Sequence, residues 1–223
     1  MIFIVYGKPG DGKTFSMTAL ALRKMKRGRR VFSNYPIVSP DRKYSSLEWK
    51  PKYIYECIHD ADIIIDEAYR DYSSRNFKDF GVDCHTFFAT NRHNDLNVYL
   101  IAQNPARVDV IIREMCNEFL AVKKHAIPFI DRPLWFTMIG YDTEENMAQK
   151  NPDAVSSKES FIFNKYVAGS YDTHQFRNPD DKPLMGVPWI EILKLGKAPQ
   201  PAGLRDVLAK FPWLFLEKIK KMV

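Results

Sequence analysis

Residues 1–14 read MIFIVYGKPGDGKT, and this stretch decides the fold of the chain. The first six residues are apolar, with β-branched and aromatic side chains, which predicts a buried strand. The next eight fit the pattern GxxxxGK[ST] in full, and a helix-like stretch continues from Thr14 to Lys26. A strand, a glycine-rich turn and a helix in this order predict the phosphate-binding loop of an α/β domain.

The residue types of the turn suit the chemistry of a bound triphosphate. Glycine lets backbone N–H groups turn inward around phosphate oxygens without a Cβ clash. Lys13 would bring a positive charge to the β- and γ-phosphates, and Thr14 would offer its hydroxyl to Mg²⁺. We therefore expect ATP and Mg²⁺ as ligands. The predicted nucleotide contacts are Gly7, Pro9, Gly10, Asp11, Gly12, Lys13, Thr14 and Phe15.

Two later apolar segments end in polar residues: residues 62–67 read DIIIDE, and residues 97–103 read NVYLIAQ. Ligands of an open α/β sheet bind at the carboxyl ends of its strands. Asp66 would therefore hold Mg²⁺, directly or through water, and Glu67 would polarise the attacking water as a general base. Gln103 would sense the γ-phosphate, provided that its strand lies beside the strand that ends at Asp66.

An arginine is also expected, because phosphoryl transfer builds up negative charge that a guanidinium from a neighbouring subunit can stabilise. Arg92, just before the segment 97–102, is the preferred candidate. Arg113, in the helix expected after that segment, is the second. Either side chain could instead form a structural salt bridge.

Alternating strand and helix signals predict an α/β fold, with a mostly parallel sheet and helices on both faces. Further strands are expected at residues 30–33, 119–123, 134–141 and 160–167. Further helices are expected at residues 82–93 and 105–115. Loops are expected at the polar or proline-containing segments 34–51, 142–158 and 171–188.

The composition is that of a globular domain. The chain has 223 residues, of which 45% are hydrophobic and 27% charged, and these values exclude a disordered, collagen-like or coiled-coil chain. No run reaches the roughly 18 apolar residues of a membrane-spanning helix, so none is expected. The three cysteines form no CxxC pair, which favours a reducing compartment. The pairs Cys57/His59 and Cys84/His85 lack zinc-type spacing.

The positive charge is concentrated at residues 23–30. Six basic side chains there equal the whole net charge of +6: Arg23, Lys24, Lys26, Arg27, Arg29 and Arg30. Cations at the end of a helix can simply complement its dipole in solvent. The same cluster could instead contact the phosphate backbone of DNA. The sequence leaves both interpretations open.

The nucleotide motifs belong to a wider resemblance. Together with VFSN at 31–34, NRHNDLNVYLIAQ at 91–103 and IFNKY at 162–166, they resemble the N-terminal ATPase domain of the zonula occludens toxin (Zot) family over residues 1–175. That family belongs to the FtsK–HerA group of P-loop ring ATPases, which move or export DNA, usually as hexamers. The resemblance implies a nucleotide site of Lys13, Thr14, Asp66, Glu67 and Gln103, with Arg92 acting in trans.

The resemblance implies an ATP-hydrolysing DNA translocase. Without a membrane span, a viral genome-packaging ATPase of the host cytoplasm, attached to the virion vertex, is preferred over an assembly and extrusion ATPase that drives virion export with a separate membrane partner. The expected partners are DNA of either strand type, other copies in a hexamer, and a protein of the capsid vertex or of a viral or host membrane. A nucleotide-binding switch and a nucleoside kinase are further alternatives, against which Glu67 and Gln103 argue.

Two parts of the chain are expected. Residues 1–175 would form the ATPase domain, and residues 176–223 a C-terminal appendage packed on the same domain or on a neighbouring subunit. Residues 203–222 carry an apolar stripe, which predicts a helix interrupted at Pro212. We expect this stripe to be core or subunit contact rather than a membrane anchor.

Overall fold

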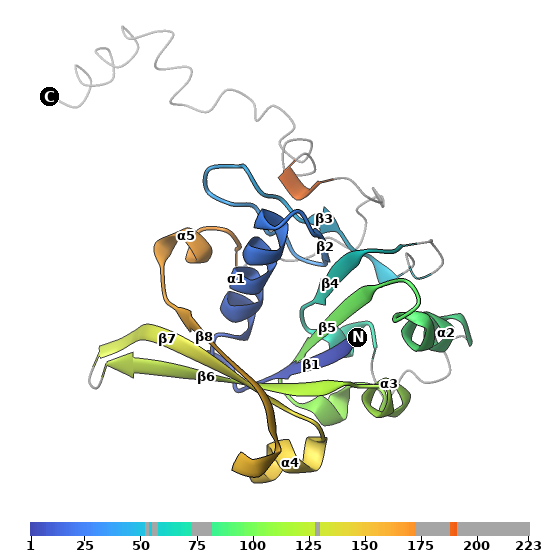
Figure 1. Cartoon of the computed structure of the whole chain (residues 1–223). Coiled ribbons are helices and arrows are strands. Elements are labelled where there is room, and N and C mark those ends of the chain that lie inside the picture. The colour runs from blue at the N-terminus through green and yellow to red at the C-terminus, as the bar shows by residue number, and fades with distance from the viewer. Residues whose placement is uncertain (52–53, 55–57, 73–81, 128–129, 173–187, 191–223) are drawn as a thin grey trace, which may run out of the picture. The chain divides into compact units, whose positions relative to one another are not determined.

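The structure, a computed structural model, describes residues 1–51, 54, 58–72, 82–127, 130–172 and 188–190. The predicted α/β fold is confirmed: an eight-stranded sheet carries helices on both faces (Figure 1). The strands follow the order β3-β2-β4-β5-β1-β6-β7-β8. The first six strands along the chain run parallel, and the last two pair antiparallel beside β6.

The strands are β1 (Ile2–Tyr6), β2 (Arg30–Ser33), β3 (Leu47–Glu48), β4 (Ala61–Ile65), β5 (Leu96–Ala102), β6 (Glu118–Ile127), β7 (Ile130–Tyr141) and β8 (Val155–Ile162). The α-helices are α1 (Lys13–Lys26), α2 (Val82–Thr90), α3 (Val110–Glu114), α4 (Glu144–Gln149) and α5 (Lys165–Ala168). Single turns of 3₁₀-helix lie at η2 (Ala68–Arg70), η3 (Pro105–Arg107) and η4 (Pro152–Ala154).

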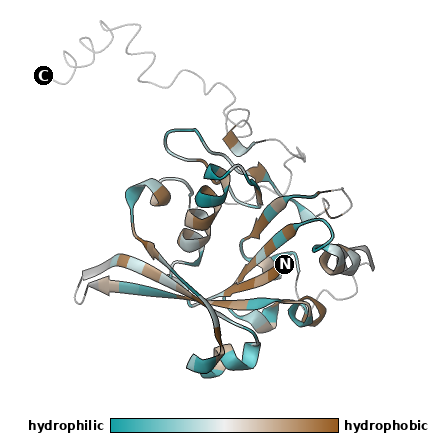
Figure 2. Cartoon of the chain, in the orientation of Figure 1, coloured by the Kyte–Doolittle hydropathy of each residue, from teal (hydrophilic) through white to brown (hydrophobic). Residues whose placement is uncertain are grey.

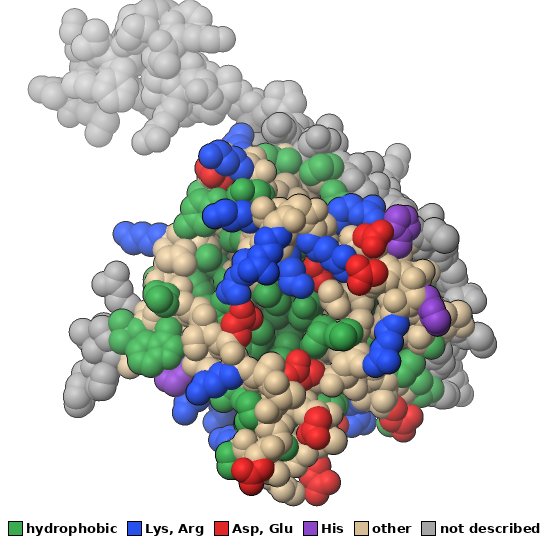
Figure 3. All heavy atoms as spheres, in the orientation of Figure 1, with side chains coloured by type: hydrophobic (Ala, Val, Ile, Leu, Met, Phe, Trp, Pro, Cys, Tyr) green, Lys and Arg blue, Asp and Glu red, His purple; other side chains and the backbone are tan. Residues whose placement is uncertain are grey.

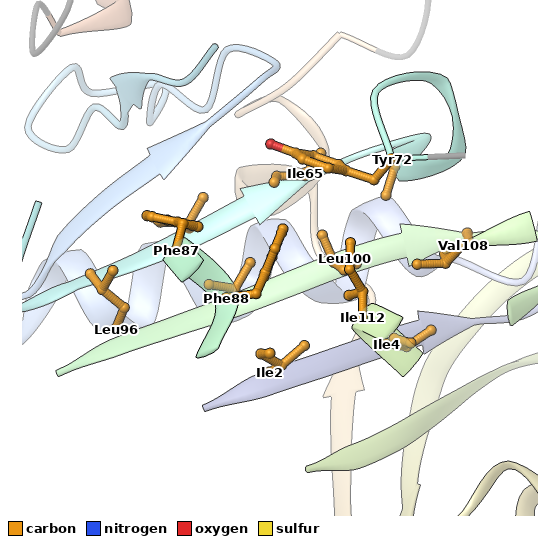
Figure 4. Close-up of a cluster of buried hydrophobic side chains, with 14 of the residues drawn as sticks. Ile2, Ile4, Ile65, Tyr72, Phe87, Phe88, Leu96, Leu100, Val108 and Ile112 are labelled. Atoms are coloured by element: carbon orange, nitrogen blue, oxygen red, sulfur yellow. The ribbon is translucent and has the colours of Figure 1, made fainter. Parts of the chain in front are cut away.

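The central strands are buried on both sides, which explains their continuous apolar runs. In β4, Ile63 and Ile65 face one core and Ile64 faces the other, because successive side chains of a strand point to opposite faces. The first core is covered by α2 and α3, and Figure 4 shows Phe87, Phe88 and Ile112 packed over its strands. The second core is covered by α1 and α5. The hydropathy colouring shows the same apolar strands (Figure 2).

The pairing of β4, β5 and β1 positions the site. β5 lies between the other two and pairs parallel with both, with Ile65 opposite Leu100 and Tyr6 opposite Ala102. All three strands therefore end at one edge of the sheet, called here the carboxyl edge. The condition set for Gln103 is met, because its strand lies directly beside the strand that ends before Asp66.

Capping side chains interrupt two of the expected elements. The helix expected at 105–115 is wrong as one element, because Val108 is extended and Asp109 caps a new helix, α3, by accepting from Ile111 N. The strand expected at 160–167 ends at Ile162, because Asn164 caps α5. In both places a short polar side chain satisfies a helix N-terminus and ends the preceding element.

Two of the expected loops contain regular structure. The segment 142–158 includes α4, which Thr143 caps, and the start of β8. The segment 34–51 includes the short strand β3. The hairpin of β6 and β7 is also longer than the expected strands 119–123 and 134–141, because its two strands pair along most of their length.

The expected appendage is described only at residues 188–190. Pro188 forms an antiparallel bridge with Leu47, and Trp189 donates its N–H to the carbonyl of Ser46 over 2.9 Å. The chain divides into two units after Ile190, and the helix expected at 203–222 lies outside the described residues. None of the helices in the described part of the chain has the length and apolar character needed to cross a membrane.

Candidate nucleotide site

The phosphate loop takes its shape from glycine and from one internal carboxylate. Gly10 and Gly12 have φ angles of 84° and 87°, which side-chain-bearing residues rarely adopt. A Cβ on Gly12 would also lie 2.2 Å from the ring of Phe136. Asp11 braces the turn, because the N–H of Lys8 donates to its Oδ2 over 2.7 Å. The loop thus leads directly into the N-terminus of α1, where N–H groups favour an anion.

Lys13 is buried inside this loop. Its Nζ donates to the carbonyl oxygens of Gly7 over 2.7 Å and Lys8 over 3.1 Å. Burial lowers the pKa of Lys13 from its ordinary value, against the opposing effect of Asp66 and other nearby carboxylates. A phosphate in the loop would give this ammonium the negative partner that its burial calls for.

Thr14 and Asp66 form the candidate metal position. Thr14 Oγ1 donates to Asp66 Oδ2 over 2.9 Å, and the other carboxylate oxygen accepts from Glu67 N over 2.8 Å. Since the hydroxyl proton points at Asp66, the lone pairs of Thr14 Oγ1 are available for a cation. These oxygens fit Mg²⁺, which is held in proteins by one or two such ligands together with phosphate and water. Burial raises the pKa of Asp66, and a bound cation would oppose that shift.

A metal site can also be built from several side chains. The described part of the chain contains no group of three or more His, Cys, Asp or Glu side chains arranged around a common point. Cys57 lies outside the described residues, as do the side chains of Cys84 and His85, so their predicted lack of a zinc role stays a prediction.

Glu67 is held in an unusual backbone conformation beside Gln103. Its φ of 51° and ψ of 44° lie in the left-handed region, which costs about 1–3 kcal/mol for such a residue and is concentrated at functional sites. Gln103 Nε2 donates to Glu67 Oε1 over 3.4 Å. Glu67 Oε2 is buried and has no hydrogen-bond partner among the described residues. That orphaned oxygen can accept a proton or a hydrogen bond from a water placed near the γ-phosphate.

Two neighbours of the site were not anticipated as functional residues. Asn34 Nδ2 donates to the carbonyl of Asp66, and Asn34 Oδ1 accepts from the Asp66 N–H, both over 2.8 Å. The nearby Glu67 carboxylate raises the pKa of Tyr69, and Arg107 stacks over the tyrosine ring at 5.5 Å. The motif VFSN already contained Asn34, but nothing in the sequence indicated its partner.

The comparisons with known proteins decide the family. The family model described as Zonular occludens toxin (Zot) matches residues 35–175, which is more than half of the chain. The chain belongs to the Zot family. The predicted resemblance is therefore confirmed, and a search of curated proteins found no match.

Solved structures support the fold of this Zot-family chain. The N-terminal domain of zonular occludens toxin from Neisseria meningitidis is similar with a TM-score of 0.53 and 17% identity, over 77% of this chain and 98% of that one. The genome packaging NTPase B204 from Sulfolobus turreted icosahedral virus 2, in complex with ATP-gammaS, gives a TM-score of 0.45 and 12% identity, over 72% and 96%. At such identities the first likeness shows the fold alone, and the second is too distant to carry an argument.

The two candidate arginines of the Zot-family chain lie apart from the carboxylates. Arg92 is exposed in the turn before β5, at the amino edge of the sheet, and β5 alone spans about 23 Å at ~3.3 Å per residue. It therefore cannot reach the site of its own subunit, and its role in trans stays a prediction. Arg113 donates to Glu144 Oε2 over 2.7 Å and to the carbonyl of Val108 over 3.2 Å, which ties it into the structure.

The basic cluster at residues 23–30 is only partly free. Figure 3 shows Lys and Arg side chains gathered near α1. Four of the six have protein partners: Arg23 pairs with Glu159, Lys24 and Arg29 with Asp62, Arg29 also with Asp95, and Arg30 with the carbonyl of His59. Lys26 and Arg27 are exposed, with no ion pair to any described residue. The cluster is thus structural in part, and these two side chains are its free members.

We predict that Asn34→Ala lowers the free energy of unfolding by about 2 kcal/mol, because it leaves the N–H and C=O of Asp66 without their partners. Chemical denaturation of both proteins would measure the difference. Gln149→Ala is the control, since Gln149 is exposed and its amide donates to Glu145 Oε1 on the surface. Its effect should stay within about 0.5 kcal/mol. Equal changes in the two variants would contradict the positioning role of Asn34.

Proposed function

We propose that this Zot-family protein is a Mg-dependent ATPase that moves DNA. The observation that carries the hydrolysis is the meeting of five side chains at the carboxyl edge of β1, β4 and β5. They are Lys13, Thr14, Asp66, Glu67 and Gln103. They bring together a buried cation for phosphate, two metal-ligand oxygens, and a carboxylate that an amide holds in place.

Each of these side chains has a defined task in the proposed reaction. Lys13 leaves the carbonyls of Gly7 and Lys8 and pairs with phosphate oxygens. Thr14 and Asp66 would hold Mg²⁺, which when bound supplies positive charge to the phosphates. Glu67 accepts a proton from the attacking water through its unpaired Oε2, while Gln103 holds Oε1 and reports the γ-phosphate.

The load is proposed to be DNA, in the role of a viral genome-packaging ATPase. Exposed Lys26 and Arg27 support a contact with a phosphate backbone. Several copies would form a ring, proposed to be a hexamer, in which exposed Arg92 serves the site of the next copy. The protein would then work in the host cytoplasm at the capsid vertex.

Membership of the Zot family favours a second candidate, an assembly ATPase that drives virion export with a separate membrane partner. Both candidates hydrolyse ATP at the same site, but the first moves DNA and the second moves the virion. Turnover that rises with single- or double-stranded DNA would support packaging and would identify the cargo. Turnover that rises only with lipid vesicles or a membrane extract would support export.

We predict that Glu67→Gln binds ATP normally but hydrolyses it about 10²–10⁴-fold more slowly, because the amide cannot accept the proton of the water. Steady-state phosphate release and ATP titration would separate the two effects. Lys13→Ala is the companion variant and should lose nucleotide binding itself. Near-normal turnover in Glu67→Gln would assign the base to another residue.

We also predict that neutralising Lys26 and Arg27 to Gln weakens DNA binding and reduces the slope of log K against log salt by about 2, since each phosphate contact contributes about 0.9. Binding titrations at several salt concentrations would show this. The control pair is Arg42→Gln with Lys43→Gln, which are also adjacent and exposed and remove the same charge. The same change in both pairs would show that only net charge matters.

A further inference from the structure

The antiparallel strands β6, β7 and β8 lie beside the phosphate loop, and they are called here the wall. β6 pairs with β1 as far as Ala121 and then continues to Ile127, past the end of β1. Figure 1 shows the β6–β7 hairpin projecting beyond its neighbours, with α1 and α5 on the same side of it. A Cβ on Gly7 would lie 2.9 Å from the carbonyl oxygen of Val122, and Gly12 lies against Phe136. The loop and the hairpin are therefore in direct contact.

The face of this wall toward α1 is apolar and partly uncovered. Phe163 stacks on Phe15 of α1, with ring centroids 5.4 Å apart. The N–H of Phe163 donates to the carbonyl of Leu134 over 2.9 Å, which places these residues opposite each other. Opposite residues of an antiparallel pair share a face. Leu134 therefore continues the aromatic row of Phe136 and Phe163, but it is 41% exposed.

The strand order determines which way a bound triphosphate points. Asp66, Glu67 and Gln103 follow β4 and β5, which both lie on one side of β1. The wall of β6, β7 and β8 stands on the other side. A nucleotide with its terminal phosphate at the carboxylates can therefore extend its other end across the phosphate loop, toward the wall.

We propose that Leu134 and Phe163 form the subsite for the base of the nucleoside triphosphate. This inference rests on the proposed nucleotide function and adds the part of the ligand that the phosphate loop does not hold. A base presents flat faces that pack well on apolar and aromatic side chains. Asn164, the nearby amide, accepts from Val167 N over 2.8 Å and donates to the carbonyl of Ile162 over 3.2 Å. These two bonds hold that amide at the cap of α5, and the contact that the apolar pair itself supplies is with the face of the base.

The test compares two ligands that share the phosphates but not the base. Calorimetric titration with Mg-ATP and with inorganic tripolyphosphate would be run on the wild type and on Leu134→Ser. We expect the affinity for ATP to fall about three- to tenfold, because the variant removes apolar contact area, while the affinity for tripolyphosphate stays the same. Leu134 is exposed, so the variant should keep its fold.

Trp135→Ser is the matched control. Trp135 is the next residue of β7, is equally exposed at 40%, and stacks on His125 on the opposite face of the hairpin. It should change neither affinity. An equal loss for both ligands in Leu134→Ser, or an ATP loss of the same size in Trp135→Ser, would overturn the subsite. Unchanged ATP affinity would overturn it and leave the ATPase proposal standing, whereas a wild type that binds neither ligand would overturn both.

Discussion

The parallel pairing of β4, β5 and β1 is the constraint on which the rest of the structure depends. Because three neighbouring strands run in the same direction, the residues that follow them meet at one edge, although they lie far apart in the chain. The hydrogen bond from Thr14 to Asp66 joins positions separated by 52 residues, and it spans the end of the strand between them. A shift of one residue in either pairing would exchange the buried isoleucines with the other face and misplace Asp66.

The site combines a phosphate loop and an Asp66 that are fixed by hydrogen bonds with a Glu67 whose backbone is strained. Glycines and Asp11 shape the loop, and Asn34 holds Asp66 by its backbone rather than by its carboxylate. The carboxylate oxygens accept from Thr14 Oγ1 and Glu67 N, and their remaining lone pairs can face a cation. Glu67, by contrast, has a left-handed backbone conformation. Its free-energy cost must be offset by the structure around it.

Local patterns were enough to predict the central strands, the phosphate loop and the polar residues at the strand ends. Each of these depends on residues close in sequence, or on the general rule that parallel strands share a carboxyl edge. Asn34 could not be given a role, because its two hydrogen bonds exist only once β2 lies beside β4. The partners of the basic cluster, Asp62, Asp95 and Glu159, come from distant segments for the same reason. Asp109 and Asn164 are residue types that commonly cap helices, so the sequence contained a signal for both helix starts. The apolar pattern around them nevertheless favoured one continuous element in each place.

The position of Arg92 has a consequence for symmetry. It lies at the amino edge of the sheet, whereas the carboxylates lie at the other. If Arg92 of one copy serves the carboxylates of the next, the contact joins two different surfaces. A two-fold dimer can make this contact only where both surfaces lie within one self-complementary interface; otherwise each contact is head-to-tail and leaves one surface of each kind unused. Copies joined head-to-tail form a closed ring if the rotation between neighbours divides a full turn evenly. Otherwise they form an open helical filament.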